Sequence, residues 1–517
     1  MAYDPIKLEV FKNLYFAIAE EMGVALCRTS FSPNIKERHD FSCAIFDGKG
    51  KMVAQAAHMP AHLGSMPLSV TSAIEHVPME RGDMVVLNDP FLGGTHLPDI
   101  TLVYPVFIGR DRTPTFYLAN RAHHADVGGA HPGSMSLSTE IFQEGIRIPP
   151  VKLMRKGKLC EEAMALILDN VRTSEEREGD ITAQVAANRV GERRLKALVA
   201  KHGLTTIRLY MRELQRYAER MTREAIRRIP DGEYCFEDFM DDDGVSPEPV
   251  LIRVKITVRG DEAVVDFSGS SPQVRGSVNA VEAVALSSVF YAFRCIVQWD
   301  IPSNSGCMEP IRLVAPPGTV VNALPPAAVA GGNVETSQRM VDVLFGALAK
   351  GIPDLIPAAS SGTMNNLTVG GLDPRPGPTH GHPFAYYETI GGGMGGRPWA
   401  PGIDAIHTHM TNTMNTPIEA LEHEYPMRVR RYQIRRGSGG KGLFRGGDGI
   451  IREVEVLGEA TVSLLSERRR FSPYGLQGGE PGQPGRNFLL SGDEKRPLPS
   501  KFALGVKGGD VLSIHTP

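Results

Sequence analysis

The stretch "DMVVLNDPFLGGTHLPDITLVYPVFI" (residues 83–108) contains two runs of β-branched and aliphatic residues on either side of a loop that is rich in glycine and proline. Runs of this composition, bounded by Gly and Pro, predict β-strands. The run "TFYLANRAH" (115–123) predicts a third strand. Histidines lie in the loop and at the end of the third run, so we expect the polar chemistry of this region where strands end and loops begin.

Outward from these strands, the sequence alternates between helical and strand patterns. Phe11, Leu14, Ile18 and Met22 recur every three to four residues, which predicts an amphipathic helix over 5–27. The charged segment 172–230 predicts helices that are interrupted at Gly203, with a solvated face of ion pairs. The remaining expected elements are hairpins at 40–55 and 250–271, buried helices at 278–298 and 336–350 (the latter opened by a capping Thr336), and short strands from 427 onward.

This pattern predicts the α+β class: a large, multi-lobed subunit with mixed sheets, a charged helical segment and a β-rich C-terminal module. The expected divisions are 1–171 for an N-terminal α+β region, 172–248 for the charged helices, 249–425 for a central α/β region with glycine-rich loops, and 426–517 for the β-rich module. A chain of 517 residues is long enough for several such units.

Charge and composition exclude some classes of protein. The chain has 56 Lys and Arg residues against 59 Asp and Glu residues, a balance that argues against a general nucleic-acid binder. No apolar run is long enough for a membrane span. Asp4, Lys7 and Glu9 interrupt the start where a signal peptide needs an apolar core, so we expect a cytoplasmic protein. The six scattered cysteines predict free thiols.

The region 93–133 holds four of the fifteen histidines. His96 and Asp99 form an H-x-x-D pair around Pro98, in a turn that can aim an imidazole and a carboxylate at one point. This ligand set suits Zn, Mn or Fe. His123 and His124 end a strand, where neighbouring side chains point to opposite faces, so we expect only one of them to reach the same metal. The alternative is a group of ordinary hydrogen-bonded histidines.

A second polar segment lies at 404–426, "DAIHTHMTNTMNTPIEALEHEYP". His407 and His409 would share a face if they lay on a strand, and Asn412 follows them. This pattern fits a polar wall for substrate, or equally a loop at an interface.

Other catalytic patterns are weak or missing. The sequence contains no Walker-type phosphate loop and no G-x-S-x-G elbow. "GGGMGG" (391–396) and "GSGGKG" (437–442) match G-x-G-x-x-G but do not follow a strand in a clear βαβ unit. The 55 glycines predict either tight loops that line a site or an interface, or a loop-rich β protein.

Taken together, several long motifs resemble the hydantoinase B / 5-oxoprolinase family. They are "RTSFSPNIKERHDFSCAIFD" (28–47), "NDPFLGGTHLPDITL" (88–102), "RAHHADVGGAHPG" (121–133), "VDFSGSSPQVRGSVNA" (265–280), "GGNVETSQR" (331–339) and "HTHMTNTMNTPIEALE" (407–422). The resemblance implies a hetero-oligomer with a hydantoinase A-type subunit that binds ATP and phosphorylates the substrate. It also implies a divalent metal held by His96, Asp99 and His123 or His124, with Asp40 as a further ligand or a base.

The expected activity is ATP-dependent hydrolysis of a cyclic amide, a hydantoin or lactam, in which a metal activates water. Asp40 takes a proton, His124 and Asp126 assist, and the backbone amides of Gly128 and Gly129 receive the developing oxyanion. His407, His409 and Asn412 are expected to contact the substrate. Two alternatives stay open: the large subunit of an acetone- or acetophenone-type carboxylase, and an inactive scaffold for the ATPase.

Overall fold

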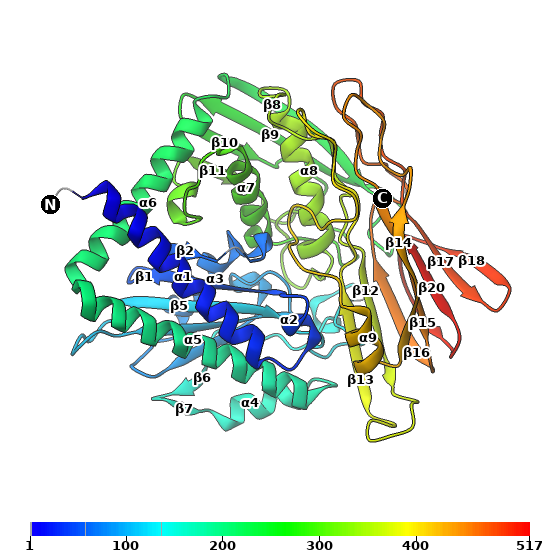
Figure 1. Ribbon diagram of the computed structural model, residues 1–517, viewed down its shortest axis with the longest axis horizontal. Coiled ribbons are helices and arrows are strands. Elements are labelled where there is room, and N and C mark those ends of the chain that lie inside the picture. Colours follow the sequence, from blue (N-terminus) through cyan, green and yellow to red (C-terminus); the bar gives the residue numbers. More distant parts are fainter. Residues whose placement is uncertain (1–2, 57, 136) are drawn as a thin grey trace.

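The computed structural model describes residues 3–56, 58–135 and 137–517. Helices and four sheets alternate along the chain, which confirms the α+β class (Figure 1). The described helices are α1 Pro5–Thr29, α2 Pro33–Lys36, α3 Ser65–His76, α4 Glu161–Leu168, α5 Ser174–His202, α6 Leu204–Ile226, α7 Glu282–Ile296, α8 Ser337–Leu348 and α9 Ile418–Glu424. None of them has the length and apolarity that crossing a bilayer requires.

The N-terminal half is organised around a seven-stranded sheet in the order β2-β1-β5-β4-β3-β6-β7. Its strands are β1 Phe41–Asp47, β2 Met52–Gln55, β3 Met84–Leu87, β4 Asp99–Val106, β5 Phe116–His123, β6 Val151–Arg155 and β7 Lys158–Leu159. In β1, Cys43 and Ile45 pack toward α1 and α5, whereas Ala44 and Phe46 pack toward α3 and α7. The two-residue period of the strand therefore buries both faces of the sheet.

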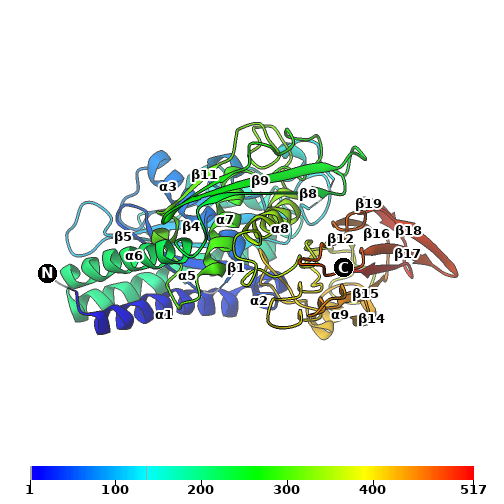
Figure 2. The same ribbon diagram turned by 90° about the horizontal axis from the view of Figure 1, so that it is seen from above.

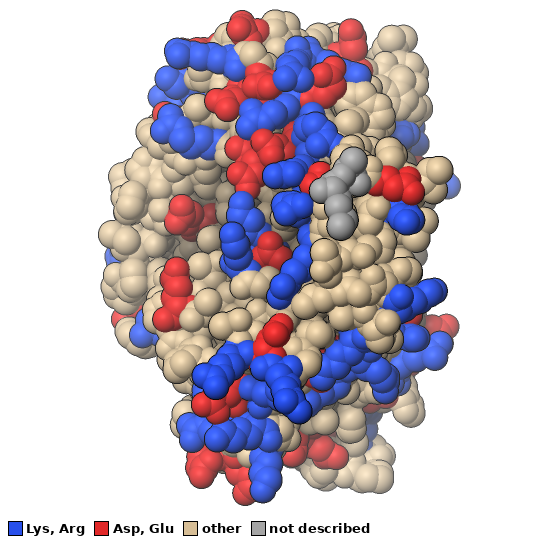
Figure 3. Space-filling model, turned by 90° about the vertical axis from the view of Figure 1, so that its left-hand side faces the viewer, with Lys and Arg blue, Asp and Glu red and all other residues tan. Residues whose placement is uncertain are grey.

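Helices α1, α5 and α6 run beside one another on one side of this sheet (Figure 2). Asp4 caps α1 by accepting from the backbone N–H of Ile6. A Cβ at Gly191 of α5 would lie 2.5 Å from Met22 Sδ, so glycine permits the close approach of α5 to α1. The predicted break at Gly203, where φ is +79°, is confirmed. Acidic and basic side chains intermingle over the left-hand side of the molecule in Figure 1, the side at which α1 begins (Figure 3).

A second sheet, in the order β11-β10-β9-β8, packs against α8. Its strands are β8 Gly232–Met240, β9 Val250–Arg259, β10 Glu262–Asp266 and β11 Ile311–Val314. The expected cap at Thr336 is wrong: a π-helical turn, Gly332–Thr336, precedes α8, and the Thr336 hydroxyl donates instead to the carbonyl of Val278.

Two further sheets pack face to face around a separate core (Figure 1). One has the order β13-β12-β16-β19, with β12 Asn366–Leu372, β13 Pro383–Glu388, β16 Ala460–Leu465 and β19 Lys501–Val506. The other has the order β14-β15-β20-β17-β18, with β14 Met427–Arg435, β15 Gly449–Val456, β17 Arg486–Ser491, β18 Glu494–Leu498 and β20 Val511–His515. The pairing of β12 with β16 crosses the division placed at 425, and β8 lies within 172–248; the four divisions stay predictions.

Candidate functional site

Strand register brings three candidate ligands together. Asp99 begins β4, His123 ends β5, and the two are direct partners in the antiparallel pairing. His96 lies in the turn just before β4, where its carbonyl accepts from the Asp99 backbone N–H. We call His96, Asp99 and His123 the trio.

The geometry of the trio fits a metal ion. His96 Nε2 lies 3.1 Å and His123 Nδ1 lies 3.3 Å from Asp99 Oδ1. One ligand atom from each residue lies within 4.8 Å of the others, and the three are 0%, 1% and 3% exposed in chain order. Ligands bonded at about 2.0 Å in a tetrahedral zinc site are separated by about 3.3 Å.

Hydrogen bonds orient the trio from behind. His96 Nδ1 lies 3.2 Å from the carbonyl oxygen of Ala330, and Asp99 Oδ2 accepts from Thr95 Oγ1 at 2.5 Å and from Asn333 Nδ2 at 3.2 Å. The Nε2 atoms of His96 and His123 have no hydrogen-bond partner among the described residues. A buried imidazole nitrogen without a hydrogen-bond partner is a group that a coordinated cation would satisfy.

His123 is held on its ring face and on its backbone. Tyr387 of β13 stacks on the imidazole at 4.3 Å with an interplanar angle of 17°. Asn34 Nδ2 donates to the His123 carbonyl at 2.6 Å. Arg38 donates to Asn34 and to the carbonyl of Tyr387, and its guanidinium lies 5.0 Å from the Tyr387 ring. Residues of the third sheet therefore close the site.

Burial and mutual charge set the protonation of this cluster. Burial would raise the pKa of Asp99, but the neighbouring imidazoles, His96 first, hold it well below its usual value. Burial lowers the pKa of His123 to about 3, so the ring is neutral, as a metal ligand must be. Burial raises the pKa of Asp40 to about 7, and Asp40 lines the same cavity as Asp99 and His123.

The structure separates His124 and Asp126 from the trio. His124 points to the opposite face of the sheet, where Nε2 lies 3.0 Å from Gln184 Oε1 of α5. The Asp126 carboxylate accepts from the backbone of Gly128 and Gly133 and pairs with Arg172 at 3.0 Å. The choice between His123 and His124 that the sequence left open thus falls on His123.

The expected oxyanion site at Gly128 is wrong, because its N–H donates to Asp126 Oδ1. Gly128 and Gly129 have φ of +86° and +85°, and a Cβ at these positions would lie 2.2 Å and 2.5 Å from the carbonyl oxygens of Asn170 and Gln143. Both glycines serve a tight loop.

The 404–416 segment is not a strand, so the expectation that His407 and His409 share a face is wrong. His409 has φ of +58°, and its ring lies beside Tyr291, with Nε2 3.7 Å from Asp342 Oδ1. His407 and Asn412 line a different, open hollow of about 410 Å³, and Asn412 also lines a cavity of about 610 Å³. Thr411, the residue before Asn412, lines the trio cavity.

Three residues near the trio were missed in the sequence. His62 Nε2 lies 3.5 Å from Asp99 Oδ2, Asn333 donates to the same oxygen, and Tyr387 stacks on His123. Asn333 lies in the motif "GGNVETSQR", which marked the segment but not the residue. His62 forms an H-x-x-x-H pair with His58, a spacing that could have drawn attention to it. Tyr387 lies far from the trio in sequence and belongs to no metal-ligand spacing.

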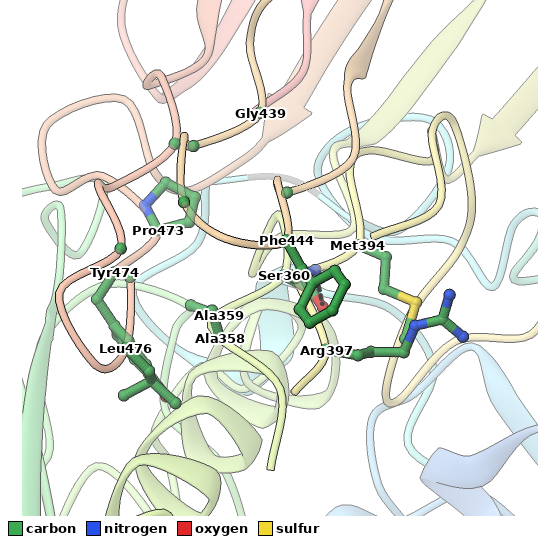
Figure 4. A pocket seen from close by; sticks show the side chains of 18 of the residues that line it. Ala358, Ala359, Ser360, Met394, Arg397, Gly439, Phe444, Pro473, Tyr474 and Leu476 are labelled. Atoms are coloured by element: carbon green, nitrogen blue, oxygen red, sulfur yellow. Dashed lines mark hydrogen bonds between the residues drawn. The ribbon is translucent and has the colours of Figure 1, made fainter. Parts of the chain in front are cut away.

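The glycine-rich segments form another cavity, of about 240 Å³ (Figure 4). Met394 and Arg397 lie on one side of it and Tyr474 and Leu476 on the other. A Cβ at Gly395 would lie 1.8 Å from the carbonyl oxygen of Ala358, and a Cβ at Gly393, Gly396 or Gly439 would lie 2.0–2.4 Å from a backbone carbonyl oxygen. Close packing of backbone on backbone explains these four glycines without a dinucleotide.

Comparison with known proteins gives the wider context. The family model described as Hydantoinase B/oxoprolinase matches residues 4–517. An uncharacterized protein of Methanocaldococcus jannaschii is 40% identical over 99% of this chain and 90% of its own length. The 5-oxoprolinase 1 of Arabidopsis thaliana is 40% identical over 99% of this chain, which spans only 41% of the plant protein.

Two solved structures share the fold. The ATP-dependent caprolactamase from Pseudomonas jessenii superposes with a TM-score of 0.90 at 29% identity, covering all of this chain and 90% of that one. Nucleotide-free acetone carboxylase has a TM-score of 0.89 at 18% identity, covering 99% of this chain and 75% of that one, a likeness of fold alone. On the strength of the match across residues 4–517, this chain belongs to the hydantoinase B/oxoprolinase family.

Proposed function

We propose that this chain is the B-type subunit of an ATP-dependent cyclic-amide hydrolase and that the trio holds a divalent cation, Zn, Mn or Fe. The observation that carries the proposal is the convergence of the buried side chains of His96, Asp99 and His123, of which Asp99 and His123 line a cavity of about 20 Å³. The names of the plant 5-oxoprolinase and the bacterial caprolactamase support a cyclic amide as substrate.

The residues around the trio have different roles in the proposed reaction. A cation bound there supplies Lewis acidity for polarising a carbonyl or activating water. Ala330, Thr95 and Asn333 orient the ligands through hydrogen bonds. Asp40 lies on the wall of the same cavity, where it can complete the ligand set or accept a proton. Tyr387 and Met364 exclude bulk water from the other side.

We assign the ATP-dependent step to a hydantoinase A-type partner subunit. Phosphorylation of the amide oxygen removes the resonance that protects a cyclic amide and creates a leaving group. The sequence has no Walker-type phosphate loop for that step. The plant enzyme contains this chain's counterpart within a protein more than twice as long, which is consistent with activation by a further part of the assembly.

The test is metal analysis and turnover of the chain purified with its A-type partner. His96→Ala and His123→Ala should lose the metal and ATP-dependent ring opening. His124→Gln is the matched control, since this buried neighbour faces α5, and it should retain the metal. A fully metallated, active His96→Ala protein would refute the assignment of the metal ligands. If the complex fixes bicarbonate in a ketone-dependent reaction and opens no ring, the activity is carboxylation and not hydrolysis.

A further inference from the structure

A cavity of about 610 Å³ adjoins the trio cavity. The trio cavity, at about 20 Å³, has room for little more than one water molecule and cannot hold a lactam ring. Met59 lines both cavities. Its neighbours divide between them: His58, Pro60 and Leu63 face the larger cavity, and His62 faces the trio.

A few residues separate the two cavities. They are Met59 and the 411–412 segment, in which Thr411 faces the trio cavity and Asn412 the larger one. The Asn412 backbone N–H contacts Met59 Sδ at 3.4 Å, and its side chain donates to the carbonyl of His58 at 3.3 Å. Methionine is unbranched and has three rotatable bonds, so rotation of Met59 is the simplest way to connect the two cavities.

The lining of the larger cavity is mostly apolar, with two cations. Phe16, Leu63, Val297, Ile301 and Pro302 supply apolar surface. Lys12 is already paired, 2.8 Å from Glu9 and 2.8 Å from Asp300. Arg294 has no ion pair within 4.0 Å among the described residues, although the more distant Asp300 senses its charge. Its Nη2 donates to the carbonyl of Ile301 at 3.0 Å, and its Nε is buried without a partner.

A guanidinium has five N–H donors in a planar fork that matches a carboxylate. The cavity therefore offers apolar surface, a guanidinium with no carboxylate in contact, and Met59, which also lines the trio cavity. Its volume lies in the range of small-molecule sites.

We infer that the 610 Å³ cavity is the substrate chamber, and that Arg294 binds a carboxylate on the cyclic amide while the ring faces Met59. The inference rests on the proposed function and deepens it. It assigns substrate selection to a place outside the trio and favours an acidic lactam over a neutral one.

The test compares two lactams that share a ring. Calorimetric titration of the full chain with its partner, without ATP, uses 5-oxoproline and 2-pyrrolidinone, which lacks the carboxylate. Wild type should bind 5-oxoproline at least tenfold more tightly. Arg294→Gln should erase that preference, and Lys12→Gln, a second cation of the same chamber that is already paired, should change it less than threefold.

A second variant keeps the inference falsifiable if Arg294→Gln loses its fold. Leu63→Trp should fill the chamber and weaken both lactams at least tenfold while the metal content stays unchanged. Three results would overturn the inference. Wild type could bind the two lactams equally, the Arg294 and Lys12 variants could have equal effects, or inorganic phosphate could displace 5-oxoproline at a similar concentration. If instead the proposed function is wrong and this inference is right, wild type will lack the metal or be inactive, but it will still bind 5-oxoproline more tightly than 2-pyrrolidinone.

Discussion

Replacing Tyr387 by leucine should weaken metal binding at the trio without touching a ligand. The tyrosine ring covers one face of His123 at 4.3 Å and is itself backed by Arg38. Removal of a partner that orients a metal ligand typically costs 10- to 100-fold in affinity, about 1.4–2.7 kcal/mol. A stacked aromatic pair supplies about 0.5–1.5 kcal/mol of that. We therefore expect Tyr387→Leu to raise the Kd for Zn²⁺ at least tenfold.

The matched control is the preceding residue on the same strand. Tyr386 is as buried as Tyr387 but points to the other face of β13, where it meets Tyr425 edge-on at 4.9 Å. Tyr386→Leu should destabilise the fold by a similar amount and leave the Kd unchanged. Tyr387→Phe keeps the ring and loses only the 2.9 Å hydrogen bond to Asn366, so it should restore most of the affinity.

The assay is competition between the purified protein and a fluorescent chelator, with unfolding measured in urea and with the visible spectrum of the Co²⁺-substituted protein as a second readout. A spectrum perturbed only in Tyr387→Leu would place the effect at the metal. If both leucine variants weaken metal binding in proportion to their loss of stability, stacking does not position His123 and the reasoning fails.

Gly395→Ala should lower the free energy of unfolding by about 1–3 kcal/mol in urea titration, because its Cβ would lie 1.8 Å from the carbonyl oxygen of Ala358; an unchanged midpoint would show that the loops can move apart. Arg452→Met should cost about 3–5 kcal/mol, since it strands the buried Glu388 carboxylate that Arg452 binds at 2.8 Å and 3.0 Å, and adding Glu388→Gln should recover part of the loss; no recovery would contradict the pairing. Burial lowers the pKa of His58 from 6.5 to about 4, so the folded state binds fewer protons than the unfolded state between these values. Stability should therefore fall by at most about 3 kcal/mol as the pH drops through that window, and His58→Gln should flatten the fall in pH-dependent urea titrations.

The elements with strong local signals were correctly expected. Helix α1 and strands β1, β4 and β5 follow from residue spacing and turn residues because each buries a face that its own sequence defines. The cap at Thr336 failed because a tertiary partner, the Val278 carbonyl, takes the hydroxyl. The prediction that His407 and His409 share a strand face was wrong because His409 adopts a left-handed backbone conformation, which side-chain spacing does not reveal.

The candidate site divides in the same way. His96 and Asp99 share a turn, and alternation along β5 limits the choice at its end to one of His123 and His124. Tyr387 could not be found from the sequence, since only the packing of the third sheet on the first brings it to His123. His62 lies in the short turn Pro60–His62 before α3 and reaches Asp99 through packing within the N-terminal region. The sequence therefore supplies the candidate ligands, and the residues that orient and cover them emerge only from long-range packing.

One buried cation joins these two groups of residues. Arg38 is fully buried and donates to Asn34 on one side and to the carbonyls of Tyr387 and Met414 on the other. Burying a guanidinium is costly unless each donor is used, and here its partners are spread over segments that lie hundreds of residues apart. Any slip between the N-terminal sheet and β13 would break several of these bonds at once. The stack of Tyr387 on His123 is thereby fixed by the same bonds, so the geometry of the trio depends on a residue that could never be a ligand.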